Sequence, residues 1–333
     1  MFIVNNYSLA VVFCVITMLC WGSWGNTQKL AGKTWRYELF YWDYVLGILV
    51  FALISAFTLG STGSEGRSFL PDLCQAEWGS IGNAFLGGII FNAANILLVV
   101  AIAIAGLSVA FPIGIGLALV LGVIINYIEH ARGNPVLLFG GVALVAVAII
   151  LNALAYSKQA KAAKKVSSKG IVLSLIAGVL MSFFFRFIAA SMDVDNFVSP
   201  AAGKMTPYTA MFIFACGVFV STFIFNTIAM RKPLEGVPVS YGEYFRGGFG
   251  IHLVGILGGL IWGLGNAFSL IAAGAAGTAI SYGLGQGATL VSALWGVWIW
   301  KEFKNAPKGV NKYLYAMFAF FLVGLSLVIA AGA

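Results

Sequence analysis

Long apolar runs, separated by short polar loops, make up almost the whole chain. Polar residues do not alternate with apolar ones inside these runs, as they would in the strands of a membrane β-barrel, so each run is predicted to be a helix. A helix needs about 20 mostly apolar residues to cross a bilayer. Ten runs have about this length: Tyr7–Gly25, Tyr41–Leu59, Asn83–Ala105, Leu107–Ile128, Val136–Tyr156, Gly170–Ser191, Tyr208–Met230, Phe249–Ile271, Gly277–Trp300 and Tyr313–Ala331. The pattern predicts an all-α polytopic membrane protein with ten transmembrane helices.

The composition supports this fold class. Of 333 residues, 61% are hydrophobic and 9% are charged, whereas a soluble globular chain has about 25% charged residues. An ordinary soluble enzyme, a disordered protein and a secreted disulfide scaffold are therefore excluded. Cys14, Cys20 and Cys216 lie inside apolar runs and Cys74 stands alone in a loop, so we interpret the cysteines as packing residues and expect no disulfides.

Basic residues are concentrated in the odd-numbered loops, whereas the even-numbered loops are poor in them. Short loops rich in Lys and Arg stay on the cytoplasmic side of a membrane. We therefore expect a multi-pass plasma (inner) membrane protein with both termini outside and the central loop in the cytoplasm. This explains the net charge of +8 without a nucleic-acid partner. The basic residues concerned are Lys29, Lys33, Arg36, Lys158, Lys161, Lys164, Lys165, Lys169, Arg231, Lys232, Arg246, Lys301, Lys304, Lys308 and Lys312.

The two halves of the chain resemble each other at a constant offset of 171 residues. This offset divides the chain into a first five-helix repeat (1–157), a basic cytoplasmic linker (158–169) and a second five-helix repeat (170–333). Because five is an odd number, the second repeat crosses the membrane in the opposite direction to the first. Such a 5+5 inverted repeat is a recurrent plan of secondary transporters, with the substrate site near the midplane. The matched positions are Leu86–Gly88 with Leu257–Gly259, Asn95 with Asn266, Ala105–Gly106 with Ala276–Gly277, Gly114 with Gly285, Gly116 with Gly287, and Leu119 with Leu290.

Several short motifs make the chain similar to a known family. These are Tyr41–Tyr44, Gly106–Val109, Asn126–Tyr127, Gly265–Asn266, Gln286, Leu290–Ser292, Trp295–Gly296 and Glu302. On these residues the sequence resembles the drug/metabolite transporter superfamily, within it the ureide permease family, and more distantly the glucose/ribose porters. The resemblance implies ten spans arranged as two inverted repeats and transport of allantoin or related heterocycles.

Polar residues at membrane depth are the candidates for solute binding, because they are costly there without a partner. Asn95 and Asn266 occupy equivalent repeat positions and could line a cavity as a pair, and Gln286 is flanked by glycines that permit a break in the helix. The alternative for the amides is hydrogen bonding between helices. Trp21 could stack on a planar solute or anchor the helix at the membrane interface. The predicted substrate-binding residues are Trp21, Asn95, Asn266, Tyr282, Gln286 and Thr289.

Charged residues inside or next to the spans are few. Asp43, between Trp42 and Tyr44, is predicted to carry a coupling proton, with a simple helix N-terminal charge as the alternative. Glu129, Arg186 and Glu302 are candidates for gate ion pairs. The alternatives are solvated helix ends for the two glutamates, and for Arg186 snorkelling toward Asp193 or Asp195.

The predicted function is secondary active transport of a small polar solute, namely a ureide, a nucleobase-like heterocycle or a sugar. We expect proton-coupled uptake by alternating access; the alternative is an uncoupled facilitator or an exporter of sugars or other metabolites from the same superfamily. No nucleophile–base pair, metal-ligand spacing or phosphate-binding loop is evident, so we expect no enzymatic activity, catalytic residue, cofactor or metal. The predicted partners are the solute, the proton and the lipid bilayer, and the protein is expected to be a monomer or a homodimer.

Overall fold

The computed structural model describes residues 1–32, 35–105, 107–159, 167–233 and 236–333. In this part of the chain nearly every residue outside short loops is helical, which confirms the all-α class. The elements are α1 (Tyr7–Ser23), α2 (Gly25–Leu30), α3 (Tyr37–Phe57), α4 (Phe69–Gln75), α5 (Trp78–Ala105), α6 (Leu107–Glu129), α7 (Pro135–Gln159), α8 (Ser168–Ala190), α9 (Pro207–Arg231), α10 (Tyr241–Phe245), α11 (Phe249–Ala276), α12 (Thr278–Gly285), α13 (Ala288–Leu294), the π-helical turn η1 (Trp295–Ile299) and α14 (Val310–Ala330).

Among the described residues, nine helical segments are long and apolar enough to cross a membrane. They coincide with nine of the ten predicted spans. The remaining span, Gly277–Trp300, is not one continuous helix: α12 ends at Gly285, α13 begins at Ala288, and η1 follows it. The three glycines around Gln286 explain the break, because glycine is the poorest helix former after proline.

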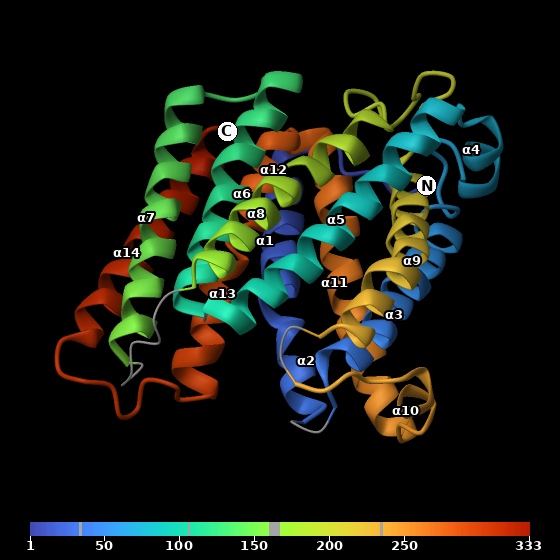
Figure 1. The fold of residues 1–333 in the computed structure, drawn as a ribbon. Coiled ribbons are helices and arrows are strands. Elements are labelled where there is room, and N and C mark those ends of the chain that lie inside the picture. Colours follow the sequence, from blue (N-terminus) through green and yellow to red (C-terminus); the bar gives the residue numbers. More distant parts are fainter. Residues whose placement is uncertain (33–34, 106, 160–166, 234–235) are drawn as a thin grey trace.

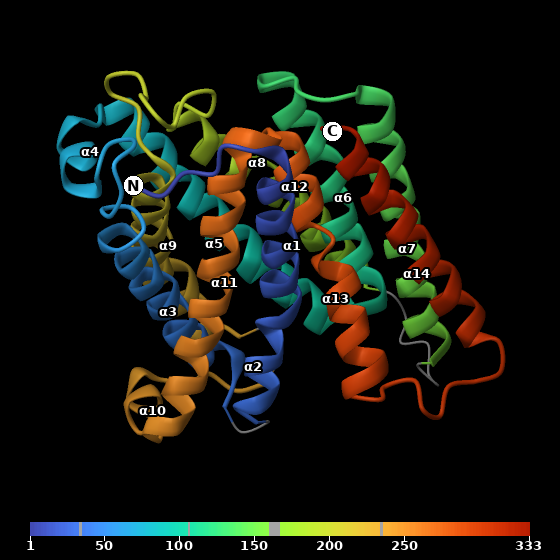
Figure 2. The same ribbon diagram turned by 180° about the vertical axis from the view of Figure 1, so that it is seen from behind.

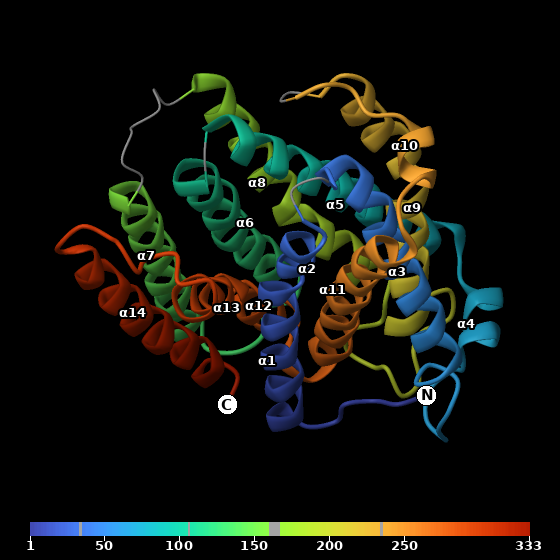
Figure 3. The same cartoon turned by 90° about the horizontal axis from the view of Figure 1, so that it is seen from below.

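The long helices lie side by side, with α12 and α13 among them, and the short helices α2, α4 and α10 lie at their ends (Figure 1). Both termini and α4 are at one end of the molecule, which we call the terminal end. The opposite end carries α2, α10 and the loop before α14, and we call it the basic end (Figure 2). Seen from the basic end, α7 and α14 form one side of the molecule and α3 and α9 the other, with α1, α6 and α11 between them (Figure 3).

Glycines bring two pairs of helices into backbone contact. On α11, a Cβ atom at Gly259 would lie 1.9 Å from the carbonyl oxygen of Tyr44, and one at Gly47 on α3 would lie 2.2 Å from that of Ile256. The contact between α5 and α9 has the same construction. There, a Cβ atom at Gly88 or Gly217 would lie 2.2 Å from a carbonyl oxygen of the facing helix. Only glycine permits this approach, and Gly259 of α11 therefore serves packing.

In chain order, the counterparts in the two halves are α1 and α8, α3 and α9, α5 and α11, α6 and α12, and α7 and α14. When each helix in a contact is replaced by its counterpart, another contact of the structure results. The contact α5–α8 is matched by α11–α1, α5–α9 by α11–α3, and α5–α6 by α11–α12. The contacts α7–α14, α3–α9 and α6–α12 each join two counterparts. The close glycine contacts follow the same exchange, since Gly88 and Gly259 are 171 residues apart.

Candidate functional site

A cavity of about 360 Å³ lies at the centre of the molecule, between α1, α2, α5, α6, α7, α8, α11, α13 and η1. Its volume is in the range of ordinary small-molecule sites. Of its lining residues, Lys29 and Trp300 are exposed and Glu302 is partly exposed, and these three belong to the basic end, whereas deeper lining residues such as Phe184 and Trp262 are buried. The cavity therefore opens at the basic end and reaches the middle of α5 and α11.

Amides provide most of the hydrogen-bonding capacity of the deep cavity. Asn95 on α5 is 7% exposed and donates from Nδ2 to the hydroxyl of Tyr41 at 3.3 Å. That hydroxyl donates in turn to Oδ1 of Asn92 at 2.6 Å, and Asn92 is tied to α9 through Ser221 and Thr222. Asn95 is thus held in place from behind while it lines the cavity.

The break in the ninth predicted span places Gln286 on the cavity wall. Gln286 follows the last residue of α12, and its side-chain amide makes no hydrogen bond to another described residue. Thr289, one turn later on α13, also lines the cavity and donates to the carbonyl oxygen of Gln286 at 3.1 Å. The backbone stays paired through the break, since the amides of Gly287 and Thr289 donate to the carbonyl oxygens of Leu284 and Gln286. The side-chain amide of Gln286 is therefore the group that is left for a solute.

Aromatic rings make up the remainder of the deep wall. Trp21, which the sequence singled out, stacks on Trp262 with ring centroids 5.9 Å apart and an angle of 11° between the planes. Phe91 also packs against Trp262, with ring centroids 4.4 Å apart. Among the described residues, the indole N–H of Trp21 and Oδ1 of the lining residue Asn152 have no hydrogen-bond partner.

Three further residues that the sequence did not single out also line the cavity, namely Phe91, Asn152 and Trp262. Trp262 lies one helical turn before Asn266 on α11, but Asn266 does not line the cavity, so this spacing would not have identified Trp262. Asn152 is a polar residue within an apolar span and satisfies the criterion applied to Asn95 and Asn266. Phe91 carries no such signal, because an aromatic residue in an apolar run is indistinguishable from ordinary packing.

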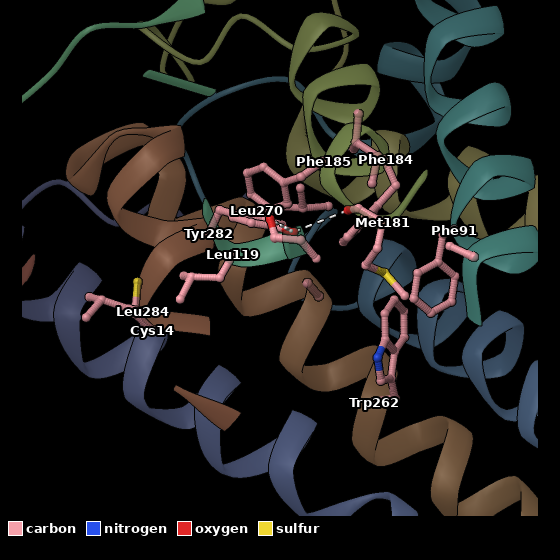
Figure 4. Close-up of a cluster of buried hydrophobic side chains, with 14 of the residues drawn as sticks. Cys14, Phe91, Leu119, Met181, Phe184, Phe185, Trp262, Leu270, Tyr282 and Leu284 are labelled. Carbon is pink, nitrogen blue, oxygen red and sulfur yellow. Dashed lines mark hydrogen bonds between the residues drawn. The ribbon is translucent and has the colours of Figure 1, made fainter. Parts of the chain in front are cut away.

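A buried cluster lies against the deep part of the cavity wall and shares Met181, Phe184 and Trp262 with it (Figure 4). Tyr282 on α12 is fully buried in it, and its hydroxyl donates to the carbonyl oxygens of Ala118 and Met181, both at 3.2 Å. Phe184 and Phe185 of α8 pack against its ring. Tyr282 therefore lies behind the cavity wall and not on it, and in this structure it ties α12 to α6 and α8.

Asn266 also lies away from the cavity in this structure. It is fully buried on α11, and its Nδ2 contacts the sulfur of Met211 on α9 at 3.1 Å. Its Oδ1 has no partner among the described residues. The two amides that the repeat relates, Asn95 and Asn266, thus have different surroundings.

An ion pair stands at the mouth of the cavity. Nζ of Lys29, on α2, lies 2.8 Å from Oε1 of Glu302, and the hydroxyl of Tyr156 donates to Oε2 of Glu302 at 2.6 Å. Burial by itself raises the pKa of Glu302, but the hydrogen bonds from Lys29 and Tyr156 and the charge of Lys29 outweigh it and lower that pKa. Glu302 is therefore held as a carboxylate beside the opening.

A second ion pair lies toward the opposite end. Nη2 of Arg186 on α8 is 2.6 Å from Oε1 of Glu129, the last residue of α6. The structure thus brings two of the gate candidates together. Asp195, considered above as a partner for Arg186, is instead paired with Arg132 at 2.9 Å.

Asp43 lies outside the cavity, in a polar cluster at the basic end. Its side chain is 1% exposed, and Oδ1 accepts a hydrogen bond from the hydroxyl of Tyr244 on α10 at 2.7 Å. Nδ1 of His252 on α11 lies 2.9 Å from Oδ1 and 3.0 Å from Oδ2. Burial and the hydrogen bond to Asp43 raise the pKa of Tyr244, which keeps its hydroxyl a donor.

The lining defines what the cavity can bind. Among the described lining residues the only charged side chains are Lys29 and Glu302, which pair with each other at the mouth. A solute that carried a net charge would find no counter-ion deep in the cavity, and burying it there would be costly. Amides and indole N–H groups between aromatic faces instead suit a neutral solute with its own donors and acceptors.

Comparison with known proteins also indicates a membrane transporter of small solutes. The family model described as ureide permease matches residues 40–169 and 159–331. Ureide permease 1 of Arabidopsis thaliana is 25% identical, with 99% of each chain covered, and ureide permease 2 of the same plant matches with the same identity and coverage. A Lactococcus lactis protein whose description provisionally assigns it to sugar uptake is 24% identical, covering 86% of this chain and 87% of its own.

A solved crystal structure has a similar fold. It aligns with 97% of this chain and 96% of its own, with a TM-score of 0.63 and 14% sequence identity, so the likeness concerns the fold alone. The family match, in contrast, covers most of the sequence. The protein is an integral multi-pass membrane protein that transports small solutes, and the chain belongs to the ureide permease family, whose members are transporters and not enzymes.

Proposed function

We propose that this protein takes up a small, neutral, polar solute together with protons, by alternating access. The observation that carries the proposal is the central cavity, which is uncharged in its depth, lined by amides and indoles, and open at one end of the molecule. A carrier needs a site that is closed from one side while it is open to the other, and this cavity has that form.

Alternating access requires two conformations of similar energy, and an inverted repeat provides them. The matched helix contacts support division of the chain into repeats 1–157 and 170–333, joined by the linker 158–169, part of which lies outside the described residues. The matched glycine contacts, α5 with α9 and α11 with α3, support it independently. In the opposite conformation each contact of one half takes the form now seen in the other.

The distribution of charge supports the proposed orientation of the protein in the membrane. The described parts of the odd-numbered loops, among them α2, α10 and the loop before α14, belong to the basic end (Figure 1), so the positive-inside rule puts that end in the cytoplasm and both termini outside. With this orientation, in the plasma (inner) membrane, the structure is open to the cytoplasm. The ion pair of Glu129 with Arg186 then lies on the external side, and that of Lys29 with Glu302 at the cytoplasmic mouth.

Two chemical classes of solute are consistent with the relatives, which are described as ureide permeases and as a sugar uptake protein. The stacked rings of Trp21, Trp262 and Phe91 favour a planar heterocycle such as a ureide or a nucleobase, whose faces they can cover. Gln286, Asn95 and Thr289 provide donors and acceptors for its edge, as they also would for sugar hydroxyls.

Thermal unfolding of the purified protein with allantoin, uracil, hydantoin, purines and monosaccharides identifies the solute class. Binding stabilises the folded state by about 2.7 kcal/mol at a hundredfold excess over Kd. The active compound is then followed, radiolabelled, into proteoliposomes with and without an imposed proton gradient. We expect accumulation that a protonophore abolishes. Equilibration without accumulation, unaffected by the gradient, would identify a facilitator, and no stabilisation by any member of the panel would contradict the proposed solute classes.

A further inference from the structure

Asp43 and His252 meet between α3, α10 and α11. Both oxygens of Asp43 lie within 3.0 Å of Nδ1 of His252. Trp35 and Tyr244 contact the imidazole edge-on, with ring centroids 5.4 and 4.8 Å away. A Cβ atom at Gly255 would lie 2.4 Å from that of Asp43. Small and aromatic residues thus enclose the pair tightly.

The pair is accessible on one side only. The side chain of Asp43 is 1% exposed, but that of His252 is 21% exposed. With Nδ1 directed at Asp43, the second ring nitrogen, Nε2, faces Gly247, where an added Cβ atom would approach it to 2.7 Å. Protons can therefore reach Asp43 through the imidazole, from the basic end, where the central cavity also opens.

Among the interactions of the described residues, none pairs Asp43 with a lysine or arginine of a neighbouring element. From α10 it receives a hydroxyl, and from α11 an imidazole. On α3 itself, Glu38 is paired with Arg36. On the other helix packed against α3, α9, the cation is Arg231 at its last position, while Trp42 makes the contact with α9. A carboxylate buried beside a neutral imidazole is therefore an uncompensated charge.

We propose that Asp43 and His252 together form a proton-binding site, with Tyr244 as its fixed hydrogen-bond donor. Without the extra proton, Nδ1–H of neutral His252 donates to the Asp43 carboxylate. A proton from water then binds Nε2, and the pair becomes imidazolium and carboxylate with no net charge. No other bond is made or broken, and Asp43 keeps both hydrogen bonds throughout.

This site rests on the proton coupling proposed above and explains how coupling can act at a distance. His252 and the cavity residue Trp262 are ten residues apart on α11, about 15 Å along a helix. Asp43 and the cavity-flanking Tyr44 are adjacent on α3, and Tyr44 stacks on the lining residue Trp24 with centroids 4.5 Å apart. Neutralising the pair changes the attraction between α3 and α11 at the end where the cavity opens.

The proton itself is the first probe. The chain has two histidines, so a His130→Gln protein labelled with ¹⁵N-histidine reports His252 alone by NMR in lipid nanodiscs. We expect Nε2 to take up a proton as the pH is lowered, while Nδ1–H stays hydrogen-bonded to Asp43. In Asp43→Asn the carboxylate that accepts from Nδ1–H is gone, so the Nδ1 signal should change. No proton uptake at Nε2, or an Nδ1 signal that Asp43→Asn leaves unchanged, would refute the site.

Proteoliposomes separate the site from the proposed function. For radiolabelled allantoin, we expect Asp43→Asn and His252→Gln each to lower the ratio of proton-driven accumulation to exchange at least tenfold, with no further loss in the double variant. His130→Gln is the matched control and should behave as the parent. A coupled parent whose Asp43 and His252 variants still accumulate allantoin refutes the site and leaves the function standing. If allantoin uptake by the parent is unaffected by the proton gradient, while Nε2 of His252 takes up a proton as expected, the coupling alone is refuted.

Discussion

Gln286 combines an unpaired side-chain amide with a position on the cavity wall. Its replacement by alanine removes donors and an acceptor that a solute can use, and we expect affinity to fall about ten- to a hundredfold, equivalent to about 1–3 kcal/mol. The folded protein should remain in the membrane, because no described hydrogen bond of the side chain is lost. Isothermal titration with the solute from the panel measures the effect, and Asn305→Ala, in an exposed loop, is the control. Unchanged affinity would make Gln286 a structural residue.

Asn266 differs from Gln286 because it is buried away from the cavity here. The repeat relates it to Asn95, so in the conformation open to the other side we expect Asn266 to occupy the wall position that Asn95 has in this structure. Asn266→Ala should therefore weaken binding from outside more than binding from the cytoplasmic side. Half-saturation measured in right-side-out and inside-out vesicles tests this, and an equal effect on both faces would contradict it.

Local sequence was informative for residues whose polarity conflicts with their surroundings. Asn95, Gln286 and Thr289 stood out in apolar runs and do line the cavity. The sequence did not reveal the hydrogen-bond partners of these residues, because partners depend on tertiary contacts. Tyr244 and His252, for example, contact Asp43 although they are 201 and 209 residues away in the sequence. His252 is isolated in the sequence and gains its significance only from the packing of α11 on α3.

The contact of α3 with α11 depends on glycine at Gly259, because an added Cβ atom would approach the carbonyl oxygen of Tyr44 to 1.9 Å. Gly259→Ala must separate the helices, and overpacking of this kind costs about 1–3 kcal/mol. We expect a lower unfolding temperature in detergent. The same substitution at Gly250, in the first turn of α11, meets nothing within 4 Å, so Gly250→Ala should be neutral or slightly stabilising. Equal unfolding temperatures for the two variants would contradict this account.

Nine of the ten predicted membrane spans are continuous helices in the described part of the chain, because an apolar run of sufficient length has no stable alternative to a helix in a bilayer. The exception is Gly277–Trp300, where hydropathy remains high although the helix is broken. Hydropathy reports burial in lipid and not continuity of the backbone. The glycines around Gln286 indicated that a break was permitted, but its position depends on packing against α1, where Gly287 meets Met18.

At the scale of the whole molecule, orientation can be tested with a native residue. Cys74 is exposed on α4 at the terminal end, whereas Cys14 and Cys20 are buried. With the termini outside, a membrane-impermeant maleimide should label the protein in intact cells, and Cys74→Ser should abolish that labelling. A cysteine introduced at exposed Lys308, at the basic end, should react only after permeabilisation. The reverse pattern would invert the orientation without affecting the fold.

The aromatic wall has a spectroscopic consequence. Five of the nine tryptophans line the cavity, namely Trp21, Trp24, Trp262, Trp295 and Trp300. Indole emission depends on the polarity and stacking around the ring, and a solute that fills the cavity changes both for more than half of the chain's indole rings. Ultraviolet emission should therefore report occupancy of the unlabelled protein in real time, fast enough for stopped-flow measurement of how quickly the cavity fills and empties.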